Sequence, residues 1–345
     1  MLENPTCIKI AQLSLVFTIS TSILYVYSWP FAFLFPLLCL HIRFYELAAM
    51  PLREYVTLFF VAFSGIAFGF GISFLYPISP ALFVAVLGAS IFSVHFWDKQ
   101  KPHQLHTALR VISVVLVSAI TMADHSIVPL FTLSLVVSLL LAMMLCYVLD
   151  KLVAYFYKHE DMSAIEHHHE ATAHEPTNEW QALLIFLPAT FIFIWLELFY
   201  YYVALVAICV LTLNPDLAFI RNNSKQYLVA NLLGCSIALG GYALYAVFEP
   251  YIDAKLLLVF SVTFLMSTLL GVIIYRTQFN SIAQFVLSPF ALLFVQSDRV
   301  DFNIFDNYQL RLVSVFMAVV YVYVAAQIVA SYREKSHKKH NKKPA

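Results

Sequence analysis

The sequence predicts an all-α, polytopic membrane protein of about twelve transmembrane helices, arranged as two parallel six-helix repeats with both termini cytoplasmic. Three observations lead to this fold class. Of the 345 residues, 61% are hydrophobic and only 12% are charged, whereas about a quarter of the residues in a soluble domain are charged. The apolar residues form runs near the length that crosses a bilayer, and Lys and Arg gather on alternate loops.

The apolar runs give the number of helices. A membrane-spanning helix needs about 20 predominantly apolar residues. In chain order the runs cover residues 10–28, 30–42, 55–75, 80–97, 108–123, 127–156, 181–198, 199–213, 227–248, 255–275, 281–296 and 310–332. Because several runs are short or abut their neighbours, ten spanning helices with re-entrant short segments is the alternative count.

The distribution of cations gives the direction of threading. With twelve helices and both termini inside, only Lys255, Arg299 and Arg311 of the 20 Lys and Arg residues fall on outer loops. The outer loops carry acids instead. This asymmetry follows the positive-inside rule, and a helix count wrong by one would reverse the sign of the later loops. Because the net charge is zero, no global field attracts nucleic acid.

A polar segment divides the chain into two membrane blocks of six runs each. The expected organisation is a first block over residues 1–156, a His/Glu-rich cytoplasmic linker over 157–179, a second block over 180–332 and a basic cytoplasmic tail over 333–345. The third helix of each block is similar: residues 53–77 and 225–250 both begin with a cation, a polar residue and Tyr, contain Gly and Ser, and end near Pro. Two blocks with an even number of helices would be parallel repeats.

Small residues mark these two similar helices. Gly69 and Gly71 in the first block and Gly240 in the second lie in Gly/Ser-rich stretches. Small residues let helix backbones approach closely in lipid, so close packing alone explains them. The functional alternative is that both helices line a substrate pathway between the blocks.

Proline interrupts a short helix at corresponding places in the two blocks. Pro36 lies in the second run, and Pro215 ends the eighth. Paired short, broken helices point to a transporter binding site, because unwound backbone can face a ligand. Simple termination of a membrane helix is the alternative.

Ionisable residues are scarce at helix centres and stand mostly near helix ends, where interfacial anchoring is the ordinary explanation. Arg43 with Glu46, and Asp216 with Arg221, follow the two broken helices and are candidates for pairing, anion binding or proton relay. Arg311 begins the last run on the predicted outer side, where it would attract an organic anion.

The linker carries a cluster of histidines. The metal-ligand candidates are His167, His168, His169 and His174, since imidazole with nearby carboxylates binds zinc. A solvated connector is the simpler interpretation of so polar a segment, and no resident metal or other cofactor is expected. Neither a nucleotide-binding motif nor a nucleophile elbow occurs, so an enzyme is not expected.

The order of short Pro-containing helix, cation and Gly-rich helix resembles the fusaric acid resistance and aromatic acid exporter superfamily. The stretch LNPDLAFIRNNSKQYLVANLLGCSIALGGYAL (213–244) carries most of the resemblance, and YQLRLVSVFMAVVYVYVAAQIV (308–329) is second. Larger members have a sizeable cytoplasmic domain after each block, whereas this chain has only a linker and a tail. It is therefore most similar to the small members of that superfamily.

The resemblance implies a proton-coupled efflux permease of a Gram-negative inner membrane that exports small aromatic or organic acids. It also implies a periplasmic membrane-fusion adaptor as partner, besides the lipid bilayer, and leaves homo-oligomerisation open. The expected pathway residues are Pro36, Glu46, Gly69, Gly71, Pro215, Asp216, Arg221, Gly240 and Arg311. A non-transport membrane component that partners an adaptor and a metal-ion transporter that uses the linker histidines are the alternatives.

Overall fold

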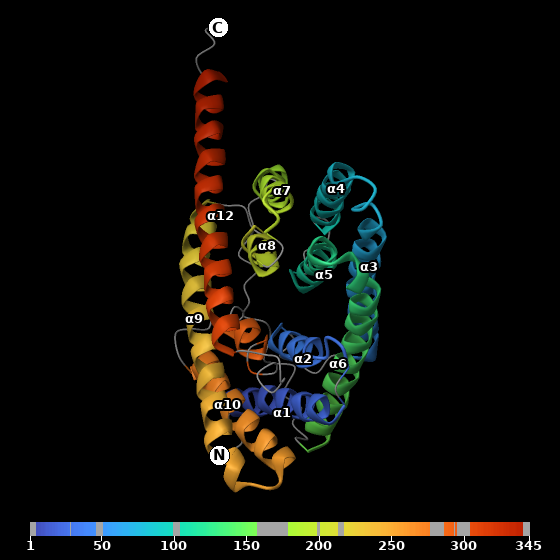
Figure 1. Cartoon of the computed structure of the whole chain (residues 1–345), viewed down its shortest axis with the longest axis vertical. Helices are drawn as coiled ribbons and strands as arrows, with labels where there is room; N and C mark the ends of the chain where they lie inside the picture. The colour runs from blue at the N-terminus through green and yellow to red at the C-terminus, as the bar shows by residue number, and fades with distance from the viewer. Residues whose placement is uncertain are drawn as a thin grey trace. The chain divides into compact units, whose positions relative to one another are not determined.

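A computed structural model describes most of the chain. The described residues are 5–27, 29–45, 51–98, 104–156, 179–198, 201–212, 217–276, 286–292, 294 and 304–340. All regular structure in these ranges is helical, as Figure 1 shows. The all-α class predicted from the sequence is therefore confirmed for the described part of the chain.

The helices coincide with the apolar runs. Their bounds are α1 Pro5–Val26, α2 Leu34–Tyr45, α3 Leu52–Ser73, α4 Pro80–Asp98, α5 Gln104–Ala123, η1 His125–Ile127, α6 Val128–Phe156, α7 Glu179–Trp195, α8 Tyr202–Leu211, α9 Leu217–Phe248, η4 Glu249–Tyr251, α10 Lys255–Arg276 and α12 Ile304–His340. Residues 286–292, within the eleventh run, are also helical. Each of the twelve runs thus contains helix.

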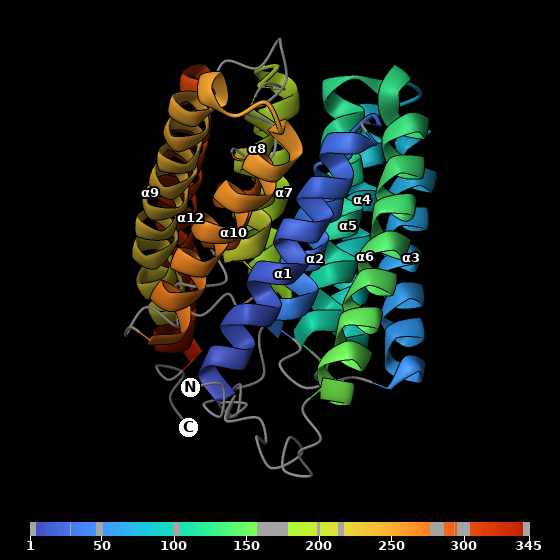
Figure 2. The same cartoon turned by 90° about the horizontal axis from the view of Figure 1, so that it is seen from below.

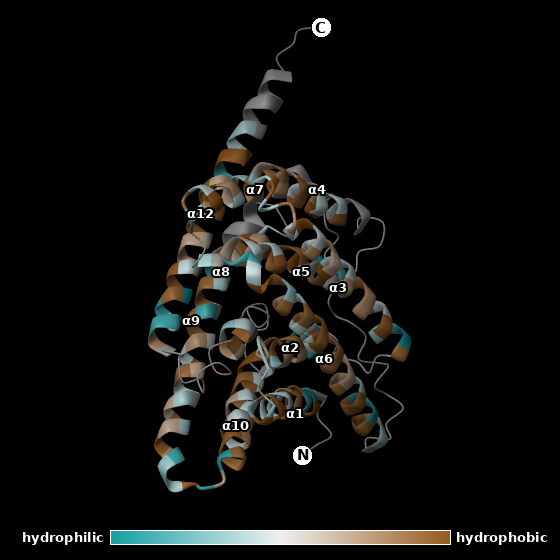
Figure 3. Ribbon diagram, turned by 45° about the vertical axis from the view of Figure 1, so that its right-hand side comes forward, coloured by the Kyte–Doolittle hydropathy of each residue, from teal (hydrophilic) through white to brown (hydrophobic). Residues whose placement is uncertain are grey.

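Six of the described helices are long and apolar enough to cross a membrane: α1, α3, α6, α9, α10 and α12. Apolar residues predominate along them in Figure 3. The other apolar helices have shorter apolar stretches, such as Leu34–Arg43 and Leu183–Trp195. The chain therefore has apolar helices typical of a membrane protein, with six candidate spans among the described residues.

Asp124 shows how one helix start is built. Its carboxylate accepts hydrogen bonds from the backbone N–H of Ser126 (2.9 Å) and from the Ser126 hydroxyl (2.6 Å). These bonds stabilise the ionised form and hold the pKa of Asp124 below its ordinary value. Asp124 is thus an N-cap for η1, which leads directly into α6.

Two tight turns contain the only non-glycine residues with positive φ among the described residues. Phe31 (φ 58°) precedes α2, and Glu197 (φ 51°) precedes α8. This left-handed conformation is unfavourable for residues with a Cβ atom. The two turns occupy corresponding places in the two sequence blocks, between the first and second helix of each.

The described contacts group the chain into two compact units. The first contains Met1–Phe60, Leu130–Glu170 and Val229–Leu310, and the second contains Val61–Pro129, Ala171–Leu228 and Arg311–Ala345. Each unit draws on both sequence blocks. The units are spatial groups of helices, so they do not bear on whether the blocks arose by duplication.

In the first unit, α1 packs against α2 and α10, as Figures 1 and 2 show. Ile10 lies against Gly271, and the Thr268 hydroxyl donates to Ser14 Oγ at 3.1 Å. As the residue number rises along α1 it falls along α10, so the two helices are antiparallel.

A second pair in this unit, α2 and α6, runs in the same direction. The ring of Phe31, just before α2, lies 5.1 Å from that of Phe131 near the start of α6. Further along, the Cys146 thiol donates to the carbonyl of Cys39 at 3.9 Å. Parallel helices cannot be joined by a short hairpin, which accounts for the three helices between them in sequence.

In the second unit, α4 packs against α5 and α7, and α8 packs against α5 and α7. The ring of Tyr76 lies 5.3 Å from that of Phe83, which fastens the turn between α3 and α4. The Tyr321 hydroxyl of α12 donates to the carbonyl of Ile185 in α7 at 2.8 Å.

Candidate functional site

Several predicted site residues lie outside the described residues. These are Glu46, Pro215, Asp216, His167, His168, His169 and His174. Arg221 belongs to the first turns of α9, but its side chain is outside the described part. Among the described residues, no group of His, Cys, Asp and Glu is arranged to hold a metal ion.

The three predicted glycines fall into two environments. A Cβ atom at Gly69 would lie 2.9 Å from Val117 Cβ and 3.1 Å from the Val114 carbonyl oxygen of α5. Gly71 and Gly240 are exposed, and a Cβ atom on either would meet nothing within 4 Å. Close packing accounts for Gly69, whereas no described contact requires glycine at the other two positions.

Gly65, one turn before Gly69, shows the same close packing. A Cβ atom there would lie 2.6 Å from the Arg110 carbonyl oxygen. As Gly65 meets the start of α5 and Gly69 a position one turn later, α3 and α5 are parallel. Small residues thus bring these two backbones into contact.

The remaining predicted residues, Pro36 and Arg311, are both buried. Pro36 lies in the first turn of α2, where a missing N–H costs little. Arg311 lies in the second turn of α12. Pro36 belongs to the first compact unit and Arg311 to the second.

The site that the structure does assemble is centred on Arg43 and Asp150. Arg43, at the end of α2, forms an ion pair through Nη2 with Asp150 Oδ1 of α6, and the two side chains are 3% and 2% exposed. The sequence suggested Glu46 as a partner for Arg43. Glu46 lies outside the described residues, so that pairing stays a prediction. The partner seen in the structure, Asp150, comes 107 residues later in the chain.

Tyr55 completes the site from a third helix. At the start of α3, its hydroxyl donates to Asp150 Oδ2 at 2.7 Å. The ring of Tyr147 lies 5.8 Å from that of Tyr55, in an edge-on arrangement, and the Lys151 ammonium lies 5.5 Å from the Tyr147 ring centre. Three helix ends, those of α2, α3 and α6, therefore meet at one buried carboxylate. We call Arg43, Tyr55 and Asp150 the buried triad.

A second layer lies one helical turn away on both α2 and α6. Cys39 precedes Arg43 by four residues, and Cys146 precedes Asp150 by four. Both cysteines are buried, and Ser20 of α1 also lies against Cys39. The parallel helices therefore place a polar layer and a charged layer at matching heights.

Some polar atoms of the buried triad have hydrogen-bond partners and others do not. A buried ion pair is stable only when both charges are paired and their remaining polar atoms are satisfied. Asp150 accepts a hydrogen bond from Tyr55 through Oδ2, and its Oδ1 contacts Arg43 Nη2 as an ion pair. Among the described residues, neither Asp150 Oδ1 nor Arg43 Nη1 has a partner in hydrogen-bond geometry. The guanidinium thus keeps donor capacity that a second acceptor would satisfy.

Sequence reasoning did not identify Asp150 or Tyr55 as a site. An acid near the end of an apolar run, such as Asp150, is ordinarily an interfacial anchor, and Tyr55 is the Tyr shared by the two similar helices. The available signal was an acidic residue within an apolar run, four residues after a cysteine, as Arg43 is in its own run.

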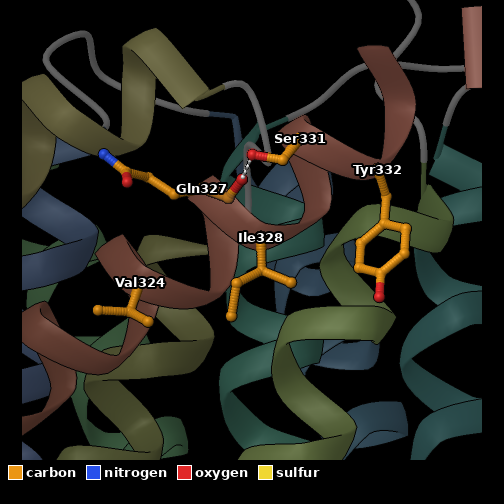
Figure 4. A pocket seen from close by; sticks show the side chains of 5 residues that line it. All are labelled: Val324, Gln327, Ile328, Ser331 and Tyr332. Atoms are coloured by element: carbon orange, nitrogen blue, oxygen red, sulfur yellow. Dashed lines mark hydrogen bonds between the residues drawn. The ribbon is translucent and has the colours of Figure 1, made fainter. Parts of the chain in front are cut away.

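A shallow surface hollow on α12 is a weaker candidate. Figure 4 shows its lining of Val324, Gln327, Ile328, Ser331 and Tyr332. The Ser331 hydroxyl donates to the Gln327 carbonyl at 2.9 Å. Because all five residues lie on one helix and no charged group joins them, this hollow has no evident chemistry.

No protein-family model, curated protein or solved structure matches this chain.

Proposed function

We propose that this protein is a multi-pass permease of a bacterial inner membrane that exports small aromatic or organic acids with proton coupling. The proposal combines the resemblance noted in the sequence with the buried triad. A Gram-negative cell with a periplasmic membrane-fusion adaptor is the setting that the resemblance implies.

The observation that carries the proposal is the burial of Arg43 and Asp150 between apolar helices. Charged groups within membrane helices are costly, and they commonly mark substrate pathways or proton relays. A guanidinium is suited to a carboxylate cargo, and an aspartate can exchange a proton.

Helix directions support the twelve-helix threading on which this proposal depends. Two even-numbered helices, α2 and α6, run parallel, and so do two odd-numbered helices, α3 and α5. The odd-numbered α1 and the even-numbered α10 run antiparallel. Alternate crossing of a bilayer requires this relation. The threading places the buried triad at the cytoplasmic ends of α2, α3 and α6.

Positive φ at Phe31 and Glu197 supports the two-block repeat in the same way. Unfavourable backbone conformations are uncommon, so their recurrence at corresponding turns favours a shared architecture. Two parallel repeats are a common plan for transporters.

Export is tested by deleting the gene and measuring intracellular accumulation of a panel of aromatic carboxylates. We expect the deletion strain to retain more of at least one acid, and a plasmid copy to restore export. Arg43→Gln should fail to restore it. Lys255→Gln is the matched control, because Lys255 belongs to an exposed ion pair with Glu249.

Unchanged accumulation of every acid in the deletion strain would contradict the proposal. That outcome would favour the alternative of a non-transport component that partners an adaptor. A metal-ion transporter would instead show metal sensitivity that depends on His167, His168, His169 and His174.

A further inference from the structure

We infer that Arg43 is the carboxylate-binding group of the cargo site, and that the Asp150 carboxylate occupies this site until a proton releases it. The proton and the cargo anion therefore bind together and leave together. This inference rests on the proposed function and adds its chemistry and the sign of its coupling.

The geometry makes Asp150 an internal substitute for a cargo carboxylate. It holds one terminal nitrogen of Arg43, while the other, Nη1, has no hydrogen-bond partner in the described part of the chain. A guanidinium binds a carboxylate best through two parallel N–H donors. Asp150 uses only part of that capacity, because Tyr55 holds its second oxygen.

Protonation of Asp150 changes the balance of charge. The carboxyl group becomes neutral and its ion pair with Arg43 is lost, which leaves this buried cation without a counter-ion among the described residues. Such a cation is strongly unfavourable in an apolar interior. A cargo carboxylate that enters and pairs with Arg43 restores neutrality, so proton binding and anion binding favour each other.

Among the described residues, the other buried groups near Asp150 do not add a second charge that changes with pH near neutrality. The titratable groups near the pair are Tyr55 of α3, Cys146 of α6 itself and Tyr275 of α10, which lies near Arg43. Lys151, the next residue on α6, is exposed, and its ammonium lies over the Tyr147 ring. Tyrosine and cysteine are neutral near pH 7 when buried. The triad therefore alternates between two states. In one, Asp150 is protonated and a cargo anion is bound to Arg43; in the other, Asp150 is ionised and no cargo is bound.

The sign of this coupling has a consequence for energetics. One proton on Asp150 and one anion on Arg43 leave together, so each cycle moves a neutral acid. Export then follows the outward concentration gradient of the acid and moves a proton out with it. The inward proton gradient does not drive this export, which differs from the energy source that the family resemblance implies.

Calorimetric titration of the purified full-length protein in detergent tests the inference, with benzoate as the probe and benzamide as the neutral control. Measurement in two buffers of different ionisation enthalpy gives the protons exchanged per ligand. We expect uptake of about one proton per benzoate, and therefore benzoate binding that weakens as the pH rises.

Variants separate the roles of the two residues. Asp150→Asn should bind benzoate without proton uptake, and its affinity for benzoate should not depend on pH. Arg43→Gln should weaken binding at least about tenfold. Because either single change leaves a buried group mispaired, the double variant Arg43→Gln/Asp150→Asn serves as an uncharged pair of amides that should fold but not bind benzoate.

Each result has a distinct meaning. Benzoate binding with proton release, or with none, would overturn the inference and leave the proposed function standing. If the folded double variant binds benzoate as tightly as the unmodified protein, Arg43 is not the carboxylate-binding group. Absence of benzoate binding by the unmodified protein at every pH, together with unchanged acid accumulation in the deletion strain, would overturn both.

Discussion

Asp150 of α6 and Arg43 of α2 pair across two parallel helices, and Tyr55 of α3 donates to the same carboxylate. One buried anion therefore joins three helix ends. Removal of Asp150 takes away the only anion paired with Arg43 among the described residues, so Asp150→Ala should lower the free energy of unfolding by about 3–5 kcal/mol. Denaturant unfolding in detergent, followed by tryptophan fluorescence, measures this.

The exposed pair of Lys255 and Glu249 is the control for that prediction. Their side chains are 55% and 36% exposed at a distance of 2.7 Å. Solvent screens such pairs, so Glu249→Ala should change stability by less than about 1 kcal/mol. If Asp150→Ala and Glu249→Ala lower the free energy of unfolding equally, burial does not make the Arg43–Asp150 pair more important for stability than the exposed pair.

Gly69 and Gly71 should respond oppositely to alanine, although they lie two residues apart. A methyl group at Gly69 meets α5, so Gly69→Ala should destabilise by about 1–3 kcal/mol. Gly71 faces open space, and Gly71→Ala should stabilise α3 by up to about 1 kcal/mol. Melting temperatures of the two variants in the same detergent give the comparison. A pathway role for Gly71 would appear as lost export without lost stability.

Glu197 is exposed and held at positive φ, so Glu197→Gly should relieve backbone strain and stabilise the protein by about 1 kcal/mol. Phe31→Gly should destabilise it, because the Phe31 ring packs on Phe131. Thermal unfolding of both variants is the measurement. Destabilisation by Glu197→Gly would mean that the Glu197 side chain has a structural role beyond its turn.

Asp124 gives a stability contribution with a predictable pH dependence. Its pKa is lower in the folded protein than its ordinary value because Ser126 donates two hydrogen bonds to the carboxylate. Since a lowered pKa means that the folded state favours ionisation, the stabilisation is present above the ordinary pKa and is lost as the pH falls through the folded value. The difference in melting temperature between the unmodified protein and Asp124→Ala should therefore shrink on acidification. A difference that is constant with pH would exclude the ionised cap as its cause.

The threading predicts opposite sides for two loops. In a Cys7→Ser background, His168→Cys in the linker should be protected from a membrane-impermeant maleimide added to intact cells, and Asp253→Cys should react. The remaining native cysteines are buried. Labelling of the linker from outside would reverse the threading and place the buried triad at the opposite face.

The sequence predicted the helices well and the site poorly. Hydrophobicity is a local property, and runs such as 80–97 and 127–156 match α4 and α6 to within one residue at each end. α12 extends well past its run, because the basic residues after Tyr332 continue the helix to His340. Its 37 residues are about 55 Å long, more than the thickness of a bilayer core.

The pairing of Arg43 with Asp150 could not be predicted from one sequence, because it depends on which distant helices are neighbours. Nearness in the chain favoured Glu46, which lies outside the described residues. Gly69 was predictable as a packing residue. Its neighbour Gly71 shows that composition alone does not separate glycines that face a helix from those that face open space.

The parallel arrangement of α2 and α6 sets an order of events during biosynthesis. Asp150 is made 107 residues after Arg43, which at ordinary elongation rates of about 5–20 residues per second is a delay of roughly 5–20 s. Throughout that interval the guanidinium at the end of α2 has no counter-ion from α6. We therefore expect water or lipid head groups to solvate Arg43 until the sixth helix is made, and its pairing with Asp150 to form only after that point.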